Sequence, residues 1–167
     1  MLEDLFDDLF PITRSITGPG LRETLELLRT AVPLKIERVP TGTEVFDWEV
    51  PEEWRIHEAY LDGPDGERIV NFDDSNLHVV NYSESVDVHL SFLELKDHLY
   101  ADESVPDATS YVTSYYDRKW GFCLPHNTYE SLPDGASRHS SETPSRILVL
   151  ETASSGIPQV PVGTGTC

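Results

Sequence analysis

Apolar residues at helical spacing predict two amphipathic helices near the start of the chain. The spacing i, i+3, i+4 and i+7 within residues 2–9 indicates a short helix that ends before Pro11. A second helix begins after Thr17, a candidate capping residue, and ends before Pro33. We expect its apolar stripe to pack against the strands of the fold, and that stripe consists of Leu21, Leu25, Leu28 and Val32.

From residue 34 onward the apolar residues mostly alternate with polar ones, which predicts β-strands. The expected strands cover residues 34–39, 44–50, 56–61, 68–72 and 77–82. Turn-forming residues at 62–66 join the third and fourth strands into a hairpin. Ser91 is positioned to cap a further helix that carries Phe92, Leu95 and Leu99, and residues 124–132 predict a last helical turn or two. Residues 111–116 are strand or loop, and the whole pattern predicts an α+β fold.

Composition changes sharply near residue 133. All sixteen aromatic residues precede residue 134, whereas Ser, Thr, Gly and Pro occupy 17 of the 34 positions in residues 134–167. Such a segment buries too little apolar surface to offset its ordering entropy. We therefore expect a disordered tail, apart from a short strand at residues 146–151 that can add to a sheet edge.

The charge balance restricts the partners of this protein. Its 167 residues include 30 acidic and 12 basic residues, for a net charge of −18, which disfavours nucleic acid and anionic membranes as partners. The two cysteines form no disulfide framework, and neither a signal peptide nor a long apolar run is evident, so we expect a cytoplasmic protein. An acid excess with only three lysines favours a halophilic protein, and an acidic mesophilic protein is the alternative.

Added salt is expected to stabilise this acidic chain. The Debye length falls from roughly 30 Å at about 0.01 M salt to roughly 3 Å at about 1 M, so distant carboxylates stop repelling one another. We expect the melting temperature to rise between low salt and molar potassium chloride. Sucrose at equal water activity is the control, because preferential exclusion stabilises compact states without screening charge. If sucrose reproduces the whole gain, or if the melting temperature is flat in salt, the acidic composition is only a solubility feature.

The candidate reactive residues form no complete catalytic or metal-binding set. Cys123 and His126 lack an orienting acid, which makes a buried cysteine the preferred interpretation over a nucleophile. Asp74 and His78 would be about 13 Å apart on a strand, so we interpret His78 as a structural histidine rather than a metal ligand. The acidic run of residues 44–74 lacks the order of a calcium loop and is typical of a solvated face.

Aromatic and imidazole side chains supply the candidate binding residues. Large amphipathic rings give contact area at little entropy cost, and they can line a groove for a peptide or a glycan. Packing in the core of a β domain is the alternative. The candidate groove residues are Trp54, His78, Tyr115, Tyr116 and Trp120.

Five phrases of the sequence, in this order, carry a family resemblance. They are FPITRSITG at residues 10–18, PTGTEVFDWEVPEEW at 40–54, SNLHVVNYS at 75–83, HLY at 98–100, and YVTSYY followed by WGFCL between 111 and 124. Together they resemble the opening of a prokaryotic aminopeptidase-like family that was formerly a domain of unknown function. The resemblance implies a zinc aminopeptidase with a β-rich domain inserted early and a winged helix at the C-terminus, and some members are associated with polysaccharide biosynthesis.

The resemblance covers residues 6–133 and implies a domain organisation. The expected parts are N-terminal helices of the aminopeptidase-like domain at residues 1–33, the β-rich inserted domain at 34–110, a return to the first domain at 111–133, and a divergent tail at 134–167. We therefore expect the helices to pack on the inserted domain beside an incomplete aminopeptidase-like α/β domain. The family's metal-binding segment, rich in His and Asp, has no counterpart in this sequence. The resemblance thus implies no catalytic residue, no metal ligand and no cofactor in this chain, although the intact family uses zinc.

Two functions are compatible with this pattern. The first is a truncated N-terminal part of a zinc aminopeptidase-like hydrolase that is inactive alone. Its partner is then the missing C-terminal catalytic region or a second copy of the chain, and uncovered apolar residues are expected on its surface. The alternative is a stand-alone β-rich module that binds a peptide or a glycan without catalysis.

Overall fold

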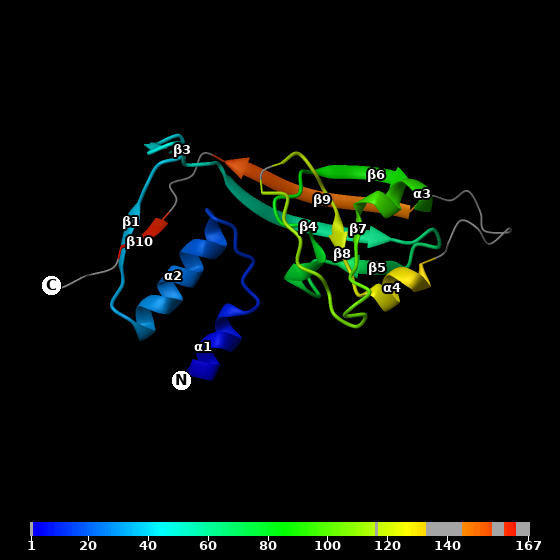
Figure 1. Ribbon diagram of the computed structural model, residues 1–167, viewed down its shortest axis with the longest axis horizontal. Coiled ribbons are helices and arrows are strands. Elements are labelled where there is room, and N and C mark those ends of the chain that lie inside the picture. The colour runs from blue at the N-terminus through cyan, green and yellow to red at the C-terminus, as the bar shows by residue number, and fades with distance from the viewer. Residues whose placement is uncertain (1, 116, 133–144, 155–158, 163–167) are drawn as a thin grey trace. The chain divides into compact units, whose positions relative to one another are not determined.

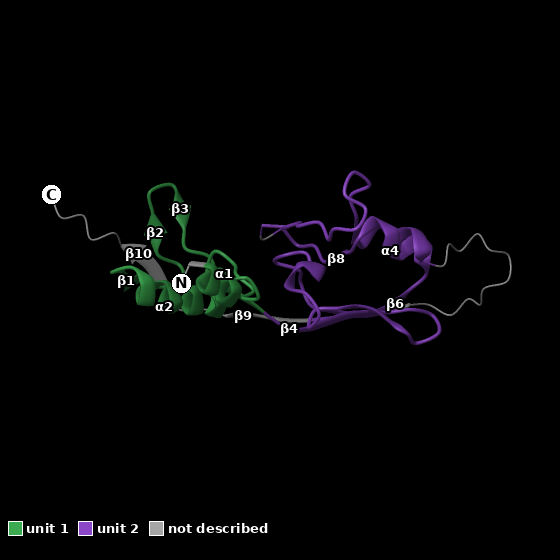
Figure 2. Ribbon diagram, turned by 90° about the horizontal axis from the view of Figure 1, so that it is seen from below, with its two compact units in different colours: residues 1–55, 152–167 green, residues 56–151 purple. Residues whose placement is uncertain are grey.

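The computed structural model describes residues 2–115, 117–132, 145–154 and 159–162, which form a mixed α+β fold as predicted (Figure 1). The chain divides into two compact units (Figure 2), residues 1–55 with 152–167 and residues 56–151. This division into units does not test the domain boundaries that the family resemblance implies, and those boundaries stay a prediction. Among the described residues, no helix combines the length and the apolar character needed to cross a membrane.

The first unit contains two helices and two short sheets. Its elements are α1 (Leu2–Leu9), α2 (Pro19–Ala31), β1 (Lys35–Arg38), β2 (Glu44–Val45), β3 (Trp48–Glu49) and β10 (Gln159–Val162). The helix α1 contacts α2, β1 pairs antiparallel with β10, and β2 pairs antiparallel with β3. Both predicted helices are therefore confirmed.

The ends of α2 follow from its local sequence. Gly18 has a φ of 124°, a conformation that L side chains rarely adopt, and Pro19 supplies the first helical turn. Val32 is extended ahead of Pro33, because a residue before proline avoids the helical region. Of the predicted apolar stripe, Leu25 is buried while Val32 lies outside the helix and is exposed. The expectation that Val32 packs with the stripe is therefore wrong.

The strand predicted over residues 44–50 is a hairpin instead. The chain reverses at Phe46 and Asp47, so that Val45 pairs with Trp48. Phe46 has a φ of 56°, which the sequence did not signal because glycine is the usual residue at such a turn position.

The second unit is built on a four-stranded sheet with the order β5-β4-β9-β6. The strands are β4 (Glu53–Asp62), β5 (Arg68–Asn71), β6 (Val86–Leu90) and β9 (Ser145–Ser154). The predicted hairpin is confirmed, since β4 pairs antiparallel with β5. The hydrophobic core includes Ala59, Leu61, Val70, Leu95, Phe122, Leu124, Ile147 and Val149.

Short helices and strands complete the second unit. They are the 3-10 helices η1 (Asn76–His78) and η2 (Lys96–His98), the helices α3 (Phe92–Leu95) and α4 (His126–Ser131), and the parallel strands β7 (Leu99–Tyr100) and β8 (Phe122–Cys123). Ser91 and Glu94 form a capping box that begins α3, which confirms the predicted cap. The strand predicted at residues 77–82 is wrong at its start, because the Ser75 hydroxyl accepts a hydrogen bond from the Leu77 amide and caps η1 there. Farther along, Val79 and Asn81 form isolated β-bridges instead of a continuous strand.

The last described strands correct our expectation for the C-terminal segment. The strand predicted at residues 146–151 exists within β9, but it lies between β4 and β6 instead of at a sheet edge. Ile147 and Val149 are fully buried in the core, and β10 was not predicted. The composition of this segment does not predict the position of β9, because both strands that flank β9 lie more than fifty residues earlier in the chain. Our expectation of disorder at residues 134–144, 155–158 and 163–167 falls outside the described residues.

Candidate functional site

Trp54 and His78, two of the predicted groove residues, lie in separate units, and each takes part in a contact within its own unit. Trp54 is buried on β4 in the first unit, and its carbonyl oxygen lies 3.5 Å from the Ser15 hydroxyl oxygen. His78 is half-buried at the end of η1 in the second unit, with Nδ1 2.9 Å from the Cys123 carbonyl oxygen. This contact supports the interpretation of His78 as a structural histidine.

The remaining predicted groove residues belong to the second unit. Trp120 stacks on His98, with ring centroids 3.7 Å apart and planes inclined by 6°. Tyr115 is exposed and contacts Tyr82 edge-on, with ring centroids 6.4 Å apart. Tyr116 lies outside the described residues. The groove stays a prediction, and neither of the two cavities described below is lined by any of these residues.

Cys123 has the environment of a structural thiol. It is fully buried in β8, and burial raises the pKa of its thiol to about 11. A nucleophilic cysteine needs a lowered pKa, whereas the environment of Cys123 disfavours the ionised thiolate form. The preference for a buried cysteine over a nucleophile is confirmed.

Cys123 is therefore expected to resist alkylation while the protein is folded. In a Cys167→Ser variant, which leaves Cys123 as the remaining thiol, iodoacetamide at pH 8 should react about 100-fold more slowly with the native chain than with the chain in urea. The measurement is the rate of mass increase. Equal rates in the two states would show that Cys123 is accessible and ionised, contrary to its burial.

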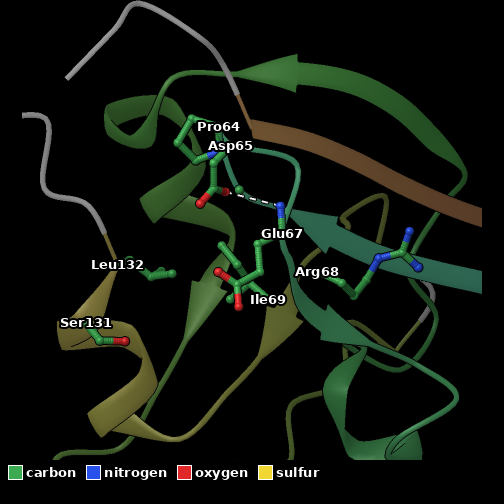
Figure 3. A pocket seen from close by; sticks show the side chains of 8 residues that line it. Pro64, Asp65, Glu67, Arg68, Ile69, Ser131 and Leu132 are labelled. Carbon is green, nitrogen blue, oxygen red and sulfur yellow. Dashed lines mark hydrogen bonds between the residues drawn. The ribbon is translucent and has the colours of Figure 1, made fainter.

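The first cavity lies in the second unit, beside the turn between β4 and β5 and the end of α4 (Figure 3). It measures about 590 Å³ and is lined by Gly63, Pro64, Asp65, Glu67, Arg68, Ile69, Ser131 and Leu132. Asp65 accepts a hydrogen bond of 3.1 Å from the Glu67 amide, which stabilises the turn. The carboxylates of Asp65 and Glu67 give the lining an acidic character.

Arg68 brings a positive charge to this lining, but its guanidinium already has partners. It donates to Asp62, which raises the pKa of Arg68, and it lies 3.6 Å from the centroid of the Tyr60 ring. The contacts with Asp62 and Tyr60 therefore hold the Arg68 side chain against the sheet. The residues that line the cavity form no complete catalytic set.

The second cavity lies in the first unit and is mostly apolar. It measures about 390 Å³ and is lined by Phe6, Asp7, Leu9, Phe10, Arg14 and Thr24. Thr24 is buried on α2, and its hydroxyl has no hydrogen-bond partner among the described residues. A buried hydroxyl without a partner is unfavourable, and the Thr24 oxygen is closed off from the open space of the cavity. Sequence reasoning missed this cavity, because the spacing of α1 predicts a helix but not which of its rings stay uncovered.

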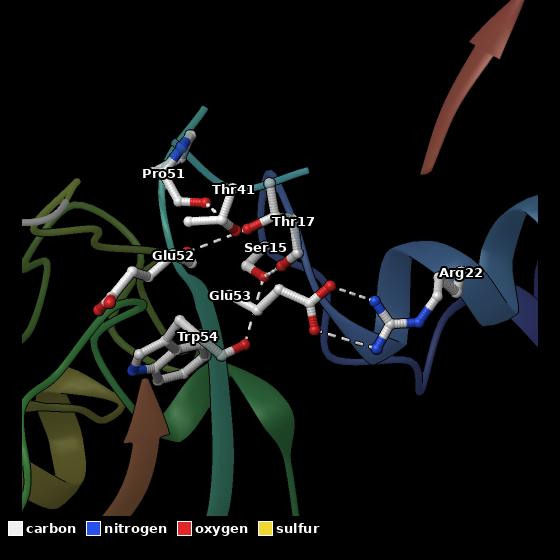
Figure 4. Close-up of polar contacts among 8 residues, drawn as sticks. All are labelled: Ser15, Thr17, Arg22, Thr41, Pro51, Glu52, Glu53 and Trp54. Carbon is white, nitrogen blue, oxygen red and sulfur yellow. Dashed lines mark hydrogen bonds and ion pairs between the residues drawn. The ribbon is translucent and has the colours of Figure 1, made fainter. Parts of the chain in front are cut away.

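A polar junction in the first unit ties the start of α2 to the start of β4 (Figure 4). Arg22 forms a two-point ion pair with Glu53, with one contact of 3.1 Å between Nη2 and Oε2. The Thr17 hydroxyl donates to the Glu52 carbonyl oxygen at 3.1 Å. Glu53 belongs to the acidic run that we predicted to be solvated, yet its side chain is only 6% exposed. The spacing of residues along the chain does not predict this pair, because Arg22 and Glu53 are 31 residues apart.

The described residues do not fit a zinc centre. Among them, no three His, Cys, Asp or Glu side chains gather closely enough to hold a metal ion. Nδ1 of His78 and Nδ1 of His98 each lie beside a backbone carbonyl oxygen, that of Cys123 and that of Trp120. The described residues therefore supply no site at which a metal could activate a water molecule.

Comparisons with known proteins identify the relatives of the chain. A protein of Clostridium acetobutylicum, named as a candidate polysaccharide biosynthesis protein with an aminopeptidase-like domain, is 44% identical over 131 residues, which cover 78% of this chain and 30% of that protein. A crystal structure of a candidate peptidase from the same organism matches with a TM-score of 0.84 and 37% identity, over 95% of this chain and 36% of that one. This chain thus spans about a third of the length of these relatives.

A family profile places the chain more specifically. The profile, described as a domain of unknown function (DUF2172), matches residues 53–140. Both this profile and the structural match extend past residue 133, so the likeness to known proteins reaches further than the sequence phrases indicate. Since the profile covers more than half of its residues, this chain belongs to the DUF2172 family.

Proposed function

We propose that this chain is the N-terminal, non-catalytic part of a zinc aminopeptidase-like hydrolase and is inactive by itself. The observation that carries the proposal is the structural match to the candidate peptidase, which covers 95% of this chain but only 36% of that protein. The lack of a ligand cluster among the described residues supports it, because hydrolysis by a metal-activated water needs about three protein ligands on one metal.

Exposed apolar side chains support a partner for this chain. The most exposed large ones in the two units are Phe6, Phe10, Phe46, Leu93, Tyr111 and Tyr115. Phe6 and Phe10 line one cavity together, and neighbouring exposed apolar side chains of this kind support a surface that a partner covers. We propose that the partner is the catalytic region of the longer relatives or a second copy of this chain, in the cytoplasm of a salt-adapted organism.

A turnover assay tests the proposal. The purified chain, supplied with a zinc salt, is expected to hydrolyse a panel of aminoacyl p-nitroanilides no faster than a blank without protein. An active zinc aminopeptidase serves as the positive control. Turnover that scales with the amount of chain and disappears with a chelator would contradict the proposal.

A second candidate function is a stand-alone module that binds a peptide or a glycan. The half-buried Trp120 stacked on His98 favours it, because paired planar rings form a surface on which a sugar or a peptide side chain can pack. A saturable change in tryptophan fluorescence on titration with oligosaccharides or short peptides, without turnover, would support this function. The Trp120→Phe variant is the control, and it should lose most of that change.

A further inference from the structure

The sheet formed by β1 and β10 in the first unit has only two strands. β1 pairs antiparallel with β10, and no third strand joins them among the described residues. Two strands alone are marginally stable in water, whereas three or more form a stable sheet. Lys35, Glu37 and Arg38 of β1 are exposed, and Ile36 is half-buried. The sheet can therefore gain stability from a further strand.

A further strand can be added beside β1 but not beside β10. Pro161 of β10 has no backbone N–H to donate, and proline within a sheet is confined to edge strands. β10 therefore stays at one edge of any larger sheet, which leaves β1 as the strand that takes a new neighbour. Figure 1 shows β1 at the border of its unit, with β10 beside it.

Two-fold symmetry restricts how two copies of β1 can pair. Hydrogen-bonded and non-hydrogen-bonded residue pairs alternate along antiparallel strands, so a two-fold axis places one residue directly opposite itself. Three of the four residues of β1 are charged, and centring on any of them would set two like charges face to face, which is destabilising. Ile36 is the uncharged residue. A register centred on Ile36 pairs the two Ile36 side chains and sets Lys35 of each copy opposite Glu37 of the other.

We propose that two copies of this chain associate through β1 in this register and form a four-stranded sheet with the order β10-β1-β1-β10. Lys35 and Glu37 lie on the same face of β1, because residues two apart in a strand do, and they already form an exposed ion pair within one chain. In the dimer each lysine lies between two carboxylates, one from its own chain and one from the second copy. The charges of β1 are thus complementary to themselves.

This inference names the partner and its contact surface, and it rests on the proposed function only for the expectation that the chain has a partner. It needs neither a catalytic region nor turnover. A monomeric chain would overturn it and leave the result of the turnover assay unaffected. Turnover by the chain would contradict the proposed function without bearing on the pairing of β1.

Sedimentation equilibrium at up to about 1 mM chain in about 0.15 M potassium chloride measures the association. The Debye length is then about 8 Å, which screens distant carboxylates of the two copies but not charges in contact. The wild-type chain is expected to self-associate. Glu37→Lys and Lys35→Glu should each weaken the association about 10-fold, because both cross-strand ion pairs become like-charge pairs. The double reversal Lys35→Glu/Glu37→Lys restores opposite charges and should associate like wild type.

A mixture of the two single variants tests the register directly. The Glu37→Lys chain is positive at both positions and the Lys35→Glu chain is negative at both, so the mixture is expected to form a heterodimer. The matched control is Glu23→Lys, at an exposed position of α2, which changes the net charge as Glu37→Lys does and should leave the association unchanged. All variants should keep the melting transition of the wild type, because the substituted side chains are exposed.

Four results would overturn the proposal. A wild-type chain that stays monomeric would mean that the charges of β1 keep this edge unpaired, as charged edge strands often do. Single variants that associate like wild type, or a mixture without a heterodimer, would exclude the pairing of Lys35 with Glu37. An equal loss of association in Glu23→Lys would indicate a general effect of net charge instead of a contact through β1.

Discussion

A chain that ends after Leu132 is expected to lose the cooperative folding of the unit at residues 56–151. The truncation removes β9 from between β4 and β6, and it takes Ile147, Leu148 and Val149 out of the sheet. Burial of each such side chain contributes about 1.5–3 kcal/mol, so the loss approaches the 5–15 kcal/mol that stabilises a whole domain. Thermal unfolding followed by near-ultraviolet circular dichroism is the measurement.

A point substitution separates the role of β9 from the effect of deleting a long segment. Ile147→Ala is expected to cost about 3 kcal/mol, or roughly 6–12 °C in melting temperature, because Ile147 is fully buried in the core. Leu93→Ala, at an exposed site, should stay within about 0.5 kcal/mol of wild type. A truncated chain that keeps the full melting transition, or equal effects of the two substitutions, would contradict the position of β9.

Arg22→Met is expected to destabilise the first unit by about 3 kcal/mol, because it leaves the nearly buried Glu53 carboxylate without its countercharge. Urea denaturation measures the free energy of unfolding. The double variant Arg22→Met/Glu53→Leu should recover most of the loss, since an apolar pair of similar size is often as stable as a buried ion pair.

The pair Lys35–Glu37 provides the matched control for Arg22 and Glu53. Both of its side chains are about half-exposed or more, so Lys35→Met should change the free energy of unfolding by less than about 1 kcal/mol. If Arg22→Met were as mild as Lys35→Met, the polar junction of Figure 4 would be a solvated contact without a structural role.

The elements that local sequence specifies were predicted well. The period of α1, the proline that begins α2, and the Ser91 cap of α3 are all contained in a few neighbouring residues. The turn between β4 and β5 is equally local, because its glycines and aspartates lie between two apolar runs. The strand β6 was missed although Val86, Val88 and Leu90 alternate with polar residues, so a stricter count of period two would have found it.

Features that depend on distant partners were not predictable in this way. The position of β9 is set by pairing with β4 and β6, and the ion pair of Arg22 with Glu53 spans 31 residues. The candidate cavity at α1 has the same origin, because Phe6 and Thr24 meet only when α1 and α2 pack. The reversal at Phe46 had no local signal at all, since the turn carries phenylalanine at a position that favours glycine.

The zinc content of the purified chain tests most directly whether it lacks a catalytic centre of its own. The chain is equilibrated with a zinc salt at neutral pH, dialysed against metal-free buffer, and measured by atomic emission beside an equal amount of a zinc aminopeptidase. We expect zinc at the level of the dialysis buffer, because the described residues gather no set of ligands, and Nδ1 of both His78 and His98 lies beside a backbone carbonyl oxygen. A stoichiometric amount of zinc that survives dialysis and accompanies peptide hydrolysis would contradict the account.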